Sequence, residues 1–154
     1  FGAMFAERQL GKYYLAISDK KPNKKQGVII GDMAKSRNGT YKLLRSKASP
    51  AKSQFFSCGM DGLRLFLLKL ATGKTHQLRV AMKSLGSSIL GDRAYSGSPS
   101  DRTYLHAFAL DFHFRNQHIQ IIAMPNEGQH FLSPLFSKSV ERFANPWALP
   151  FPAI

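Results

Sequence analysis

The chain has 154 residues, of which 44% are hydrophobic and 20% charged, a composition that excludes a disordered chain and is typical of one globular domain. Lys and Arg number 22 against nine Asp and Glu, and the formal net charge of +13 favours a polyanionic partner such as nucleic acid. No apolar run approaches 18 residues and the basic segment has no clean amphipathic period, so we expect no membrane partner.

The positive charge is concentrated in the first third of the chain. Residues 1–52 contain twelve Lys and Arg but only three Asp and Glu. Charge bears on association and solubility and not on fold, so lysines that only keep the protein soluble remain an alternative to a nucleic-acid surface. Cys58 is the single cysteine, which excludes an internal disulfide and a Cys-based metal site. With no recognisable signal peptide, a reducing, cytoplasmic setting is expected.

The first elements alternate between a short helix and aromatic or branched strands. Residues 1–8 have the pattern of the middle or end of a helix, and Gly11 is expected to stop it. Residues 12–17 and 28–30 are predicted strands, separated by an exposed Lys-, Pro- and Asn-rich loop at 19–27. The Asn38-Gly39 pair in the following basic segment predicts a hairpin turn.

The second part of the chain continues with hairpins and one helix. Residues 54–58 and 63–70 flank a Met-Asp-Gly turn, while 104–114 and 118–123 form a further predicted strand pair. Between them, residues 77–85 have helical spacing and Gly86 closes the helix. We therefore predict a single domain over 1–154, of class α+β, with a mixed, largely antiparallel sheet and flanking helices.

The block Thr72–Arg79 places chemically useful side chains beside a corner of the chain. Gly73 is expected at a strand-to-helix corner, and His76 and Arg79 then lie three apart on one helical face. A fixed arginine there can hold a carboxylate or a phosphate with its planar fork of donors. Taken alone, the pair is also compatible with a structural ion pair at Arg79 and a hydrogen-bonded, partly buried His76.

Three sequence blocks in a fixed order favour the functional interpretation of His76 and Arg79 over the structural one. Thr-Gly-Lys-Thr-His-Gln-Leu-Arg is followed by Leu-Gly-Asp-x-x-Tyr and then by Leu-His-Ala, and Lys-Tyr-Tyr-Leu-Ala near the start is a weaker fourth match. Over roughly residues 5–125 this pattern closely resembles the RluA-type family of RNA pseudouridine synthases. The matched positions in the three main blocks are Thr72, Gly73, Lys74, His76, Gln77, Leu78, Arg79, Leu90, Gly91, Asp92, Tyr95, Leu105, His106 and Ala107.

The resemblance implies isomerisation of uridine in RNA to its C-glycoside isomer, with no cofactor and no metal. In the family, an aspartate attacks the nucleoside, and the base leaves, turns and rejoins through C5 after the uridine has been taken out of its stack. The matched Tyr14 lies against the base and is a candidate for removing the C5 proton. Arg79 pairs with the catalytic carboxylate and orients it, and Leu105 forms an apolar wall of the uracil pocket.

Each of these residues also has a structural interpretation. Tyr14 and Leu105 could be ordinary core side chains. Lys12 and Lys74 either contact RNA phosphate or are merely solvated. Asp92 is expected to serve a turn after Gly91, and His106 to make a structural hydrogen bond.

The nucleophile of the family is not found in the sequence. The aspartate belongs to an Arg-Leu-Asp segment upstream of the tyrosine matched by Tyr14, and no Arg-Leu-Asp occurs in this chain. We expect that the chain is the C-terminal portion of a pseudouridine synthase catalytic domain, with a partial pseudouridine synthase fold. This chain alone should then be inactive, because covalent catalysis is lost without its nucleophile.

The leading hypothesis is therefore an RNA pseudouridine synthase that acts as a monomer on rRNA or tRNA, two targets that the sequence does not separate. A non-catalytic RNA-binding module of the same fold is the alternative, and the residue found at the nucleophile position of the full-length protein separates the two. A basic ribosome-associated structural protein would explain the charge but leaves the order of the motifs unexplained.

Overall fold

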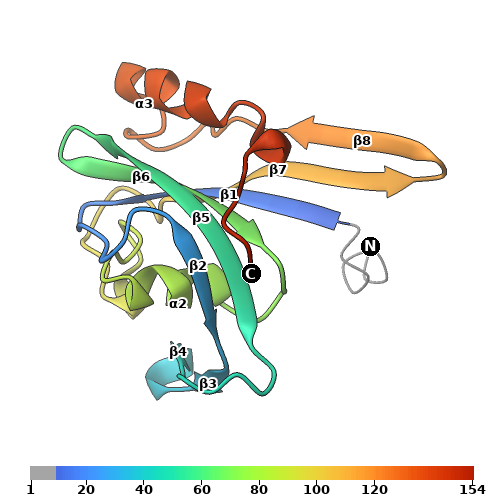
Figure 1. Ribbon diagram of the computed structural model, residues 1–154. Coiled ribbons are helices and arrows are strands. Elements are labelled where there is room, and N and C mark those ends of the chain that lie inside the picture. The colour runs from blue at the N-terminus through green and yellow to red at the C-terminus, as the bar shows by residue number, and fades with distance from the viewer. Residues whose placement is uncertain (1–9) are drawn as a thin grey trace.

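The computed structural model describes residues 10–154, and its central feature is a six-stranded sheet (Figure 1). Neighbouring strands follow the order β2-β5-β6-β1-β7-β8, and every pairing between them is antiparallel. The strands are β1 (Leu10–Ser18), β2 (Gly27–Gly31), β5 (Ala51–Met60), β6 (Leu63–Leu70), β7 (Leu105–Phe114) and β8 (Gln117–Ile122). The predicted α+β fold with a largely antiparallel sheet is confirmed.

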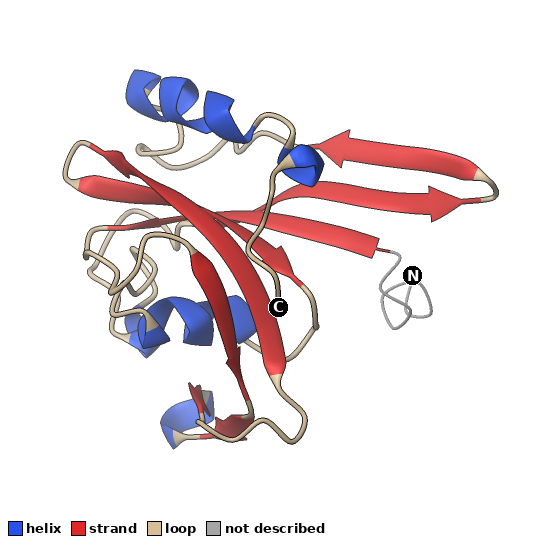
Figure 2. Cartoon of the chain, viewed as in Figure 1, coloured by secondary structure: helices blue, strands red, loops and turns tan. Residues whose placement is uncertain are grey.

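Two helices cover opposite faces of this sheet (Figure 2). They are α2 (Gln77–Ser84) and α3 (Pro134–Ser139), accompanied by the 3-10 turns η1 (Arg37–Gly39), η2 (Arg93–Tyr95), η3 (Val140–Phe143) and η4 (Pro146–Ala148). Because both faces are covered, the centre of strand β6 can be continuously apolar, and residues 65–68 are all fully buried. The core therefore lies on both sides of β6 and β1.

A small hairpin stands apart from the main sheet. It consists of β3 (Met33–Lys35) and β4 (Tyr41–Leu43), and it lies beside α2 (Figure 1). Its turn contains Asn38 and Gly39, both with positive φ (52° and 75°), as the sequence predicts. The β5–β6 hairpin turns in the same way at Asp61 and Gly62 (49° and 80°), so both hairpin predictions are confirmed.

Some expectations differ from the structure. Gly11 lies inside β1, while the helix predicted over residues 1–8 falls outside the described residues. The predicted helix over 77–85 is α2, and Gly86 follows it with a φ of 73°. The sequence patterns do not predict α3 or η3. Their clearest signal is Ser133, whose hydroxyl accepts the Phe136 N–H as an N-cap ahead of a proline.

Candidate active site

Two adjacent tyrosines of β1 serve opposite faces of the sheet, because side chains alternate along a strand. Tyr13 is buried against Phe151 of the C-terminal segment, with ring centroids 6.0 Å apart. Tyr14 is half-buried and lines two cavities. The pairing of β1 with β7 shifts register between these residues, and the extra residue of this bulge is Phe108 of β7, so the alternation along β1 is preserved. Tyr14 is thus accessible at a cavity and is not a fully buried core aromatic.

A cavity of about 160 Å³ gathers most of the residues singled out from the sequence. Four of the five predicted site residues line it, and they come from the distant segments β1, α2 with its preceding turn, and β7. The fifth, Lys12, lines a neighbouring cavity of about 290 Å³ that shares Tyr14. The complete lining of the smaller cavity is Tyr14, Leu70, Lys74, His76, Gln77, Leu78, Arg79 and Leu105.

The corner between β6 and α2 is held by one buried amide. The Gln77 side chain donates to the Lys52 carbonyl (2.8 Å) and the Ser53 hydroxyl (2.9 Å). Its Oε1 accepts from the Thr72 hydroxyl (2.8 Å) and the Lys74 N–H (3.0 Å), which saturates the amide. The Thr and Gln of the first motif block therefore fix the corner to β5, and with it the position of α2.

Arg79 forms a bidentate ion pair with Asp92. Its Nε and Nη2 each donate to one carboxylate oxygen at 2.9 Å, and Asp92 is only 3% exposed. This hydrogen bonding raises the pKa of Arg79 above its usual range. The guanidinium also lies over the Tyr95 ring, 4.7 Å from its centroid. The structural ion pair considered from the sequence is therefore present. Asp92 serves the turn after Gly91 as expected, but through its backbone carbonyl, which accepts the N–H groups of Tyr95 and Gly97. Its carboxylate makes no cap bond and pairs with Arg79 instead.

The glycine of the second block is required by a close backbone approach. Gly91 has a φ of 85°, and a Cβ placed on it would lie 1.8 Å from the Arg102 carbonyl oxygen. The Gly91 N–H donates to the Ser98 carbonyl (2.7 Å), so the loop closes tightly around this point. The Leu-Gly-Asp block thus carries Asp92 back to Arg79 across a turn that only glycine permits.

The third block supplies the opposite wall of the cavity. Leu105 is half-buried and lines the cavity, whereas the His106 ring nitrogen Nε2 lies 2.6 Å from the Ala123 carbonyl oxygen. The structural hydrogen bond expected for His106 is confirmed. The side chain of Arg102, which sequence reasoning missed, donates to the Leu105 carbonyl (3.3 Å) and lies over the Phe131 ring. Its only signal in the sequence is its position three residues before Leu105.

Lys74 and Tyr95 are two further side chains in or next to the lining of the smaller cavity. Lys74 is exposed, lines the cavity, and donates from Nζ to the Ser49 hydroxyl (3.2 Å). The Tyr95 hydroxyl lies 2.8 Å from Nδ1 of His76 and accepts the Tyr41 N–H at 2.9 Å. His76 adopts a left-handed conformation (φ 56°) just before α2, so it does not share a helical face with Arg79 as predicted.

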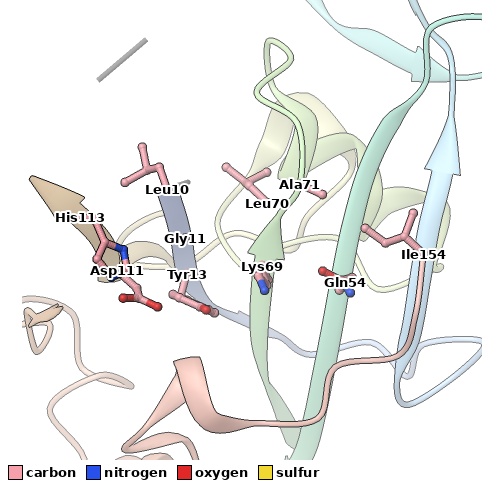
Figure 3. Close-up of a pocket in the computed structure, with 10 residues that line it drawn as sticks. All are labelled: Leu10, Gly11, Tyr13, Gln54, Lys69, Leu70, Ala71, Asp111, His113 and Ile154. Carbon is pink, nitrogen blue, oxygen red and sulfur yellow. The ribbon is translucent and has the colours of Figure 1, made fainter. Parts of the chain in front are cut away.

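A larger cavity of about 600 Å³ lies at Tyr13 and contains none of the predicted site residues (Figure 3). Tyr13, Lys69 and Asp111 contribute polar groups to it. Burial, with a smaller contribution from Asp111, raises the pKa of Tyr13 to about 12. The phenol therefore stays neutral over the whole physiological range. Size does not identify the site here, because the motif residues converge elsewhere.

Within residues 10–154, no three or more His, Cys, Asp and Glu side chains gather in a way that could hold a metal ion. No helix in that part of the chain is long and apolar enough to cross a membrane.

Solved structures share this fold. The human protein "RNA Pseudouridylate Synthase Domain Containing 1" superposes with a TM-score of 0.71 at 22% identity, covering 99% of this chain and 71% of that one. A second human protein, "RNA Pseudouridylate Synthase Domain Containing 4", superposes with a TM-score of 0.65 and covers 92% of this chain. The sheet and its flanking helices are therefore those of pseudouridylate synthase domains.

Sequence comparison gives the family. The family model described as RNA pseudouridylate synthase matches residues 1–84, more than half of the chain, and the protein belongs to that family. An uncharacterized RNA pseudouridine synthase of Haemophilus influenzae is 49% identical over 144 residues, covering 92% of this chain and 64% of that protein. The dual-specificity RNA pseudouridine synthase RluA of Salmonella typhimurium is 33% identical over 116 residues, covering 69% of this chain and 52% of that protein. The chain thus spans less than two thirds of either relative.

Proposed function

We propose that this chain forms part of the catalytic domain of an enzyme that isomerises uridine to pseudouridine in structured RNA, either rRNA or tRNA. The observation that carries the proposal is the convergence of Tyr14, Lys74, Arg79 and Leu105 on one cavity from segments far apart in the sequence. Leu70, Leu78 and Leu105 give this cavity an apolar lining, and Lys74 gives it a cation. An apolar slot beside positive charge suits a flipped base and its phosphate.

In this mechanism Tyr14 lies against the uracil ring and removes the C5 proton, and Leu105 forms the facing wall. Arg79 orients the nucleophilic carboxylate. It can do so only through the guanidinium N–H groups that do not donate to Asp92. Arg102 donates to the backbone carbonyls of Thr103, Leu105 and Glu127 and does not line the cavity, so Arg79 is the guanidinium assigned to that pairing. The enzyme acts in the cytoplasm, as a monomer and without a cofactor, and Lys12 contributes to RNA binding.

A basic arm supports RNA as the partner. We define the arm as residues 32–49, which include the β3–β4 hairpin. Five of its side chains are exposed cations that form no ion pair with any residue in 10–154: Lys35, Arg37, Lys42, Arg45 and Lys47. Its one carboxylate, Asp32, accepts hydrogen bonds from the Ser46 hydroxyl and from two backbone N–H groups, which lower its pKa. The arm is therefore a net cationic surface beside the cavity, as phosphate binding requires.

The proposal is tested with the 154-residue chain and rRNA and tRNA transcripts. We expect binding without isomerisation, because the sequence contains no Arg-Leu-Asp and so lacks the family's nucleophile. Release of tritium from C5 of labelled uridine measures turnover, and filter binding measures affinity. Tritium release by this chain alone would contradict the need for that aspartate.

A non-catalytic RNA-binding module is the second candidate, favoured by the engagement of Arg79 with Asp92. The coding sequence upstream of Phe1 separates the two. Arg-Leu-Asp there supports the synthase, and an unrelated residue in place of the aspartate supports the binding module.

A further inference from the structure

The Tyr95 hydroxyl forms two hydrogen bonds, and the direction of each can be deduced from its partner. The side chain is 1% exposed, and the oxygen has two partners within the described residues, the Tyr41 N–H and Nδ1 of His76. A backbone N–H can only donate, so Tyr95 accepts from Tyr41. Nδ1 is then the acceptor available to the phenolic proton. Tyr95 therefore donates to His76 and holds its Nδ1 without a proton.

This arrangement determines the tautomer of His76. A neutral imidazole whose Nδ1 accepts a hydrogen bond carries its proton on Nε2. Nε2 has no hydrogen-bond partner in residues 10–154. Every fully buried side-chain nitrogen or oxygen in that part of the chain does have a partner, so Nε2 must be accessible to solvent. The ring lies edge-on to Tyr41 (5.6 Å) and Tyr95 (5.7 Å), which fixes its plane. An oriented N–H donor is thus left over on a side chain that lines the cavity.

The same hydroxyl connects the basic arm to the cavity. Tyr41 belongs to β4 of the arm, and its N–H is bound by Tyr95 from η2. The Tyr95 ring in turn lies under the Arg79 guanidinium. One buried residue therefore positions the arm, the His76 ring and the Arg79 side chain relative to one another.

We propose that His76 is a substrate-binding residue that donates its Nε2–H to an oxygen of the bound nucleotide, and that Tyr95 is the positioning residue that fixes this donor and seats the arm. The inference rests on the proposed function, since it concerns the same cavity. A cavity of about 160 Å³ is well below the roughly 300–1,000 Å³ of drug-sized sites, so it suits one ring and not a whole nucleotide. The other polar side chains that line the cavity are mainly hydrogen-bond donors. An acceptor oxygen, from a base carbonyl or from phosphate, can accept hydrogen bonds from them and from His76.

The first experiment measures the tautomer without RNA. Two-bond proton–nitrogen correlation spectra of the uniformly ¹⁵N-labelled chain distinguish Nδ1–H from Nε2–H in neutral histidines, and His76→Gln assigns the signal among the five histidines. We expect the Nε2–H form in the wild type and a mixture of both forms in Tyr95→Phe. Faster hydrogen exchange of the Tyr41 amide is expected in the same variant. A wild-type ring protonated on Nδ1 overturns the inference.

The second experiment separates the two ring nitrogens. Asn at position 76 retains an acceptor near Tyr95 but loses the Nε2–H donor, whereas Gln places an amide N–H near the Nε2 position. With a uridine-containing RNA hairpin, His76→Asn should bind about 3- to 10-fold more weakly than the wild type, and His76→Gln should recover most of that affinity. His113→Asn, which changes an exposed histidine beside the larger cavity, is the matched control and should bind like the wild type.

The outcomes are distinguishable. Unchanged affinity in His76→Asn, or equally weakened binding in the Asn and Gln variants, overturns the donor role while leaving the proposed function standing. Repeating the titration with inorganic phosphate and with free uridine separates a phosphate oxygen from a base carbonyl. If the wild type binds no RNA at all, the proposed function fails and the donor role fails with it, and the spectra still decide whether Tyr95 sets the tautomer.

Discussion

Two neighbouring tyrosines show how much one position along a strand changes a side chain. Tyr13 is 3% exposed, and its pKa is raised to about 12, chiefly by burial. Tyr14 is half-buried at the cavity and lies on the face that carries α2. The sequence Lys-Tyr-Tyr-Leu-Ala contains both without distinguishing their surroundings. Only Tyr14 lines the cavity in which we propose that the base binds.

The raised pKa of Tyr13 predicts a loss of stability at high pH. The folded protein favours the neutral phenol, so the stabilisation is complete below pH 10 and disappears as the pH rises from about 10 to about 12. After allowance for solvent screening, it amounts to about 1–2 kcal/mol. Denaturant unfolding across this range measures it, with Tyr13→Phe as the control because other groups also titrate there. An equally steep fall of stability in both proteins would contradict the assignment.

At the scale of elements, tight turns bring the motif blocks together. The loop after Leu90 returns Asp92 to Arg79, and its path passes so close to Arg102 that Gly91 has no room for a side chain. The saturated amide of Gln77 performs the matching task at the start of α2. Both blocks thus act first as structural devices that position the cavity wall.

Gly91→Ala should destabilise the protein by about 3 kcal/mol or more, because a positive φ and a backbone clash act together. The control is Gly86→Ala, at a glycine with a similar φ of 73° where an added Cβ meets nothing within 4 Å. That change should cost only about 1–2 kcal/mol. The free energy of unfolding from denaturant titrations provides the comparison. Equal destabilisation of the two variants would show that the close approach to Arg102 is unimportant.

Local signals predict the elements, and long-range contacts are beyond them. The Asn-Gly and Asp-Gly turns, the strands that they join and α2 follow from residue type and spacing. The pairing of Arg79 with Asp92 depends on how a loop folds back, and the bond between Tyr95 and Tyr41 joins residues 54 apart. Neither can be found by counting along the chain. The six-residue α3 is too short to give a clear period.

On the scale of the whole molecule, the arrangement of charge is more informative than its total. The arm places five exposed cations at one side of the cavity, whereas α3 and its neighbours lie on the opposite face of the sheet (Figure 2). Other exposed cations are spread over the rest of the described chain, but the arm combines five of them beside the cavity with no ion pair to a carboxylate in residues 10–154. The arm is therefore the surface at which the RNA hypothesis can be tested.

Replacing Lys35, Arg37 and Lys42 by Gln should weaken RNA binding and flatten its salt dependence. The slope of log K against log salt should fall by about 0.7–0.9 for each phosphate that the variant no longer neutralises. A second triple variant, with Arg115, Lys138 and Arg142 replaced by Gln, removes the same charge from exposed positions away from the arm and should keep most of the slope. Equal effects of the two triple variants on the slope would show that only net charge matters.

The place of β1 in the sheet has a consequence for the time course of folding. This strand is the earliest described element, yet both of its partners, β6 and β7, come much later in the chain. During synthesis at about 5–20 residues per second, the stretch from Ser18 to Leu105 takes on the order of 5–20 s to appear. Until then, the backbone N–H and C=O groups on that edge of β1 have no β7 to pair with. The nascent chain should therefore depend on chaperones during that interval and fold only after β7 has left the ribosome.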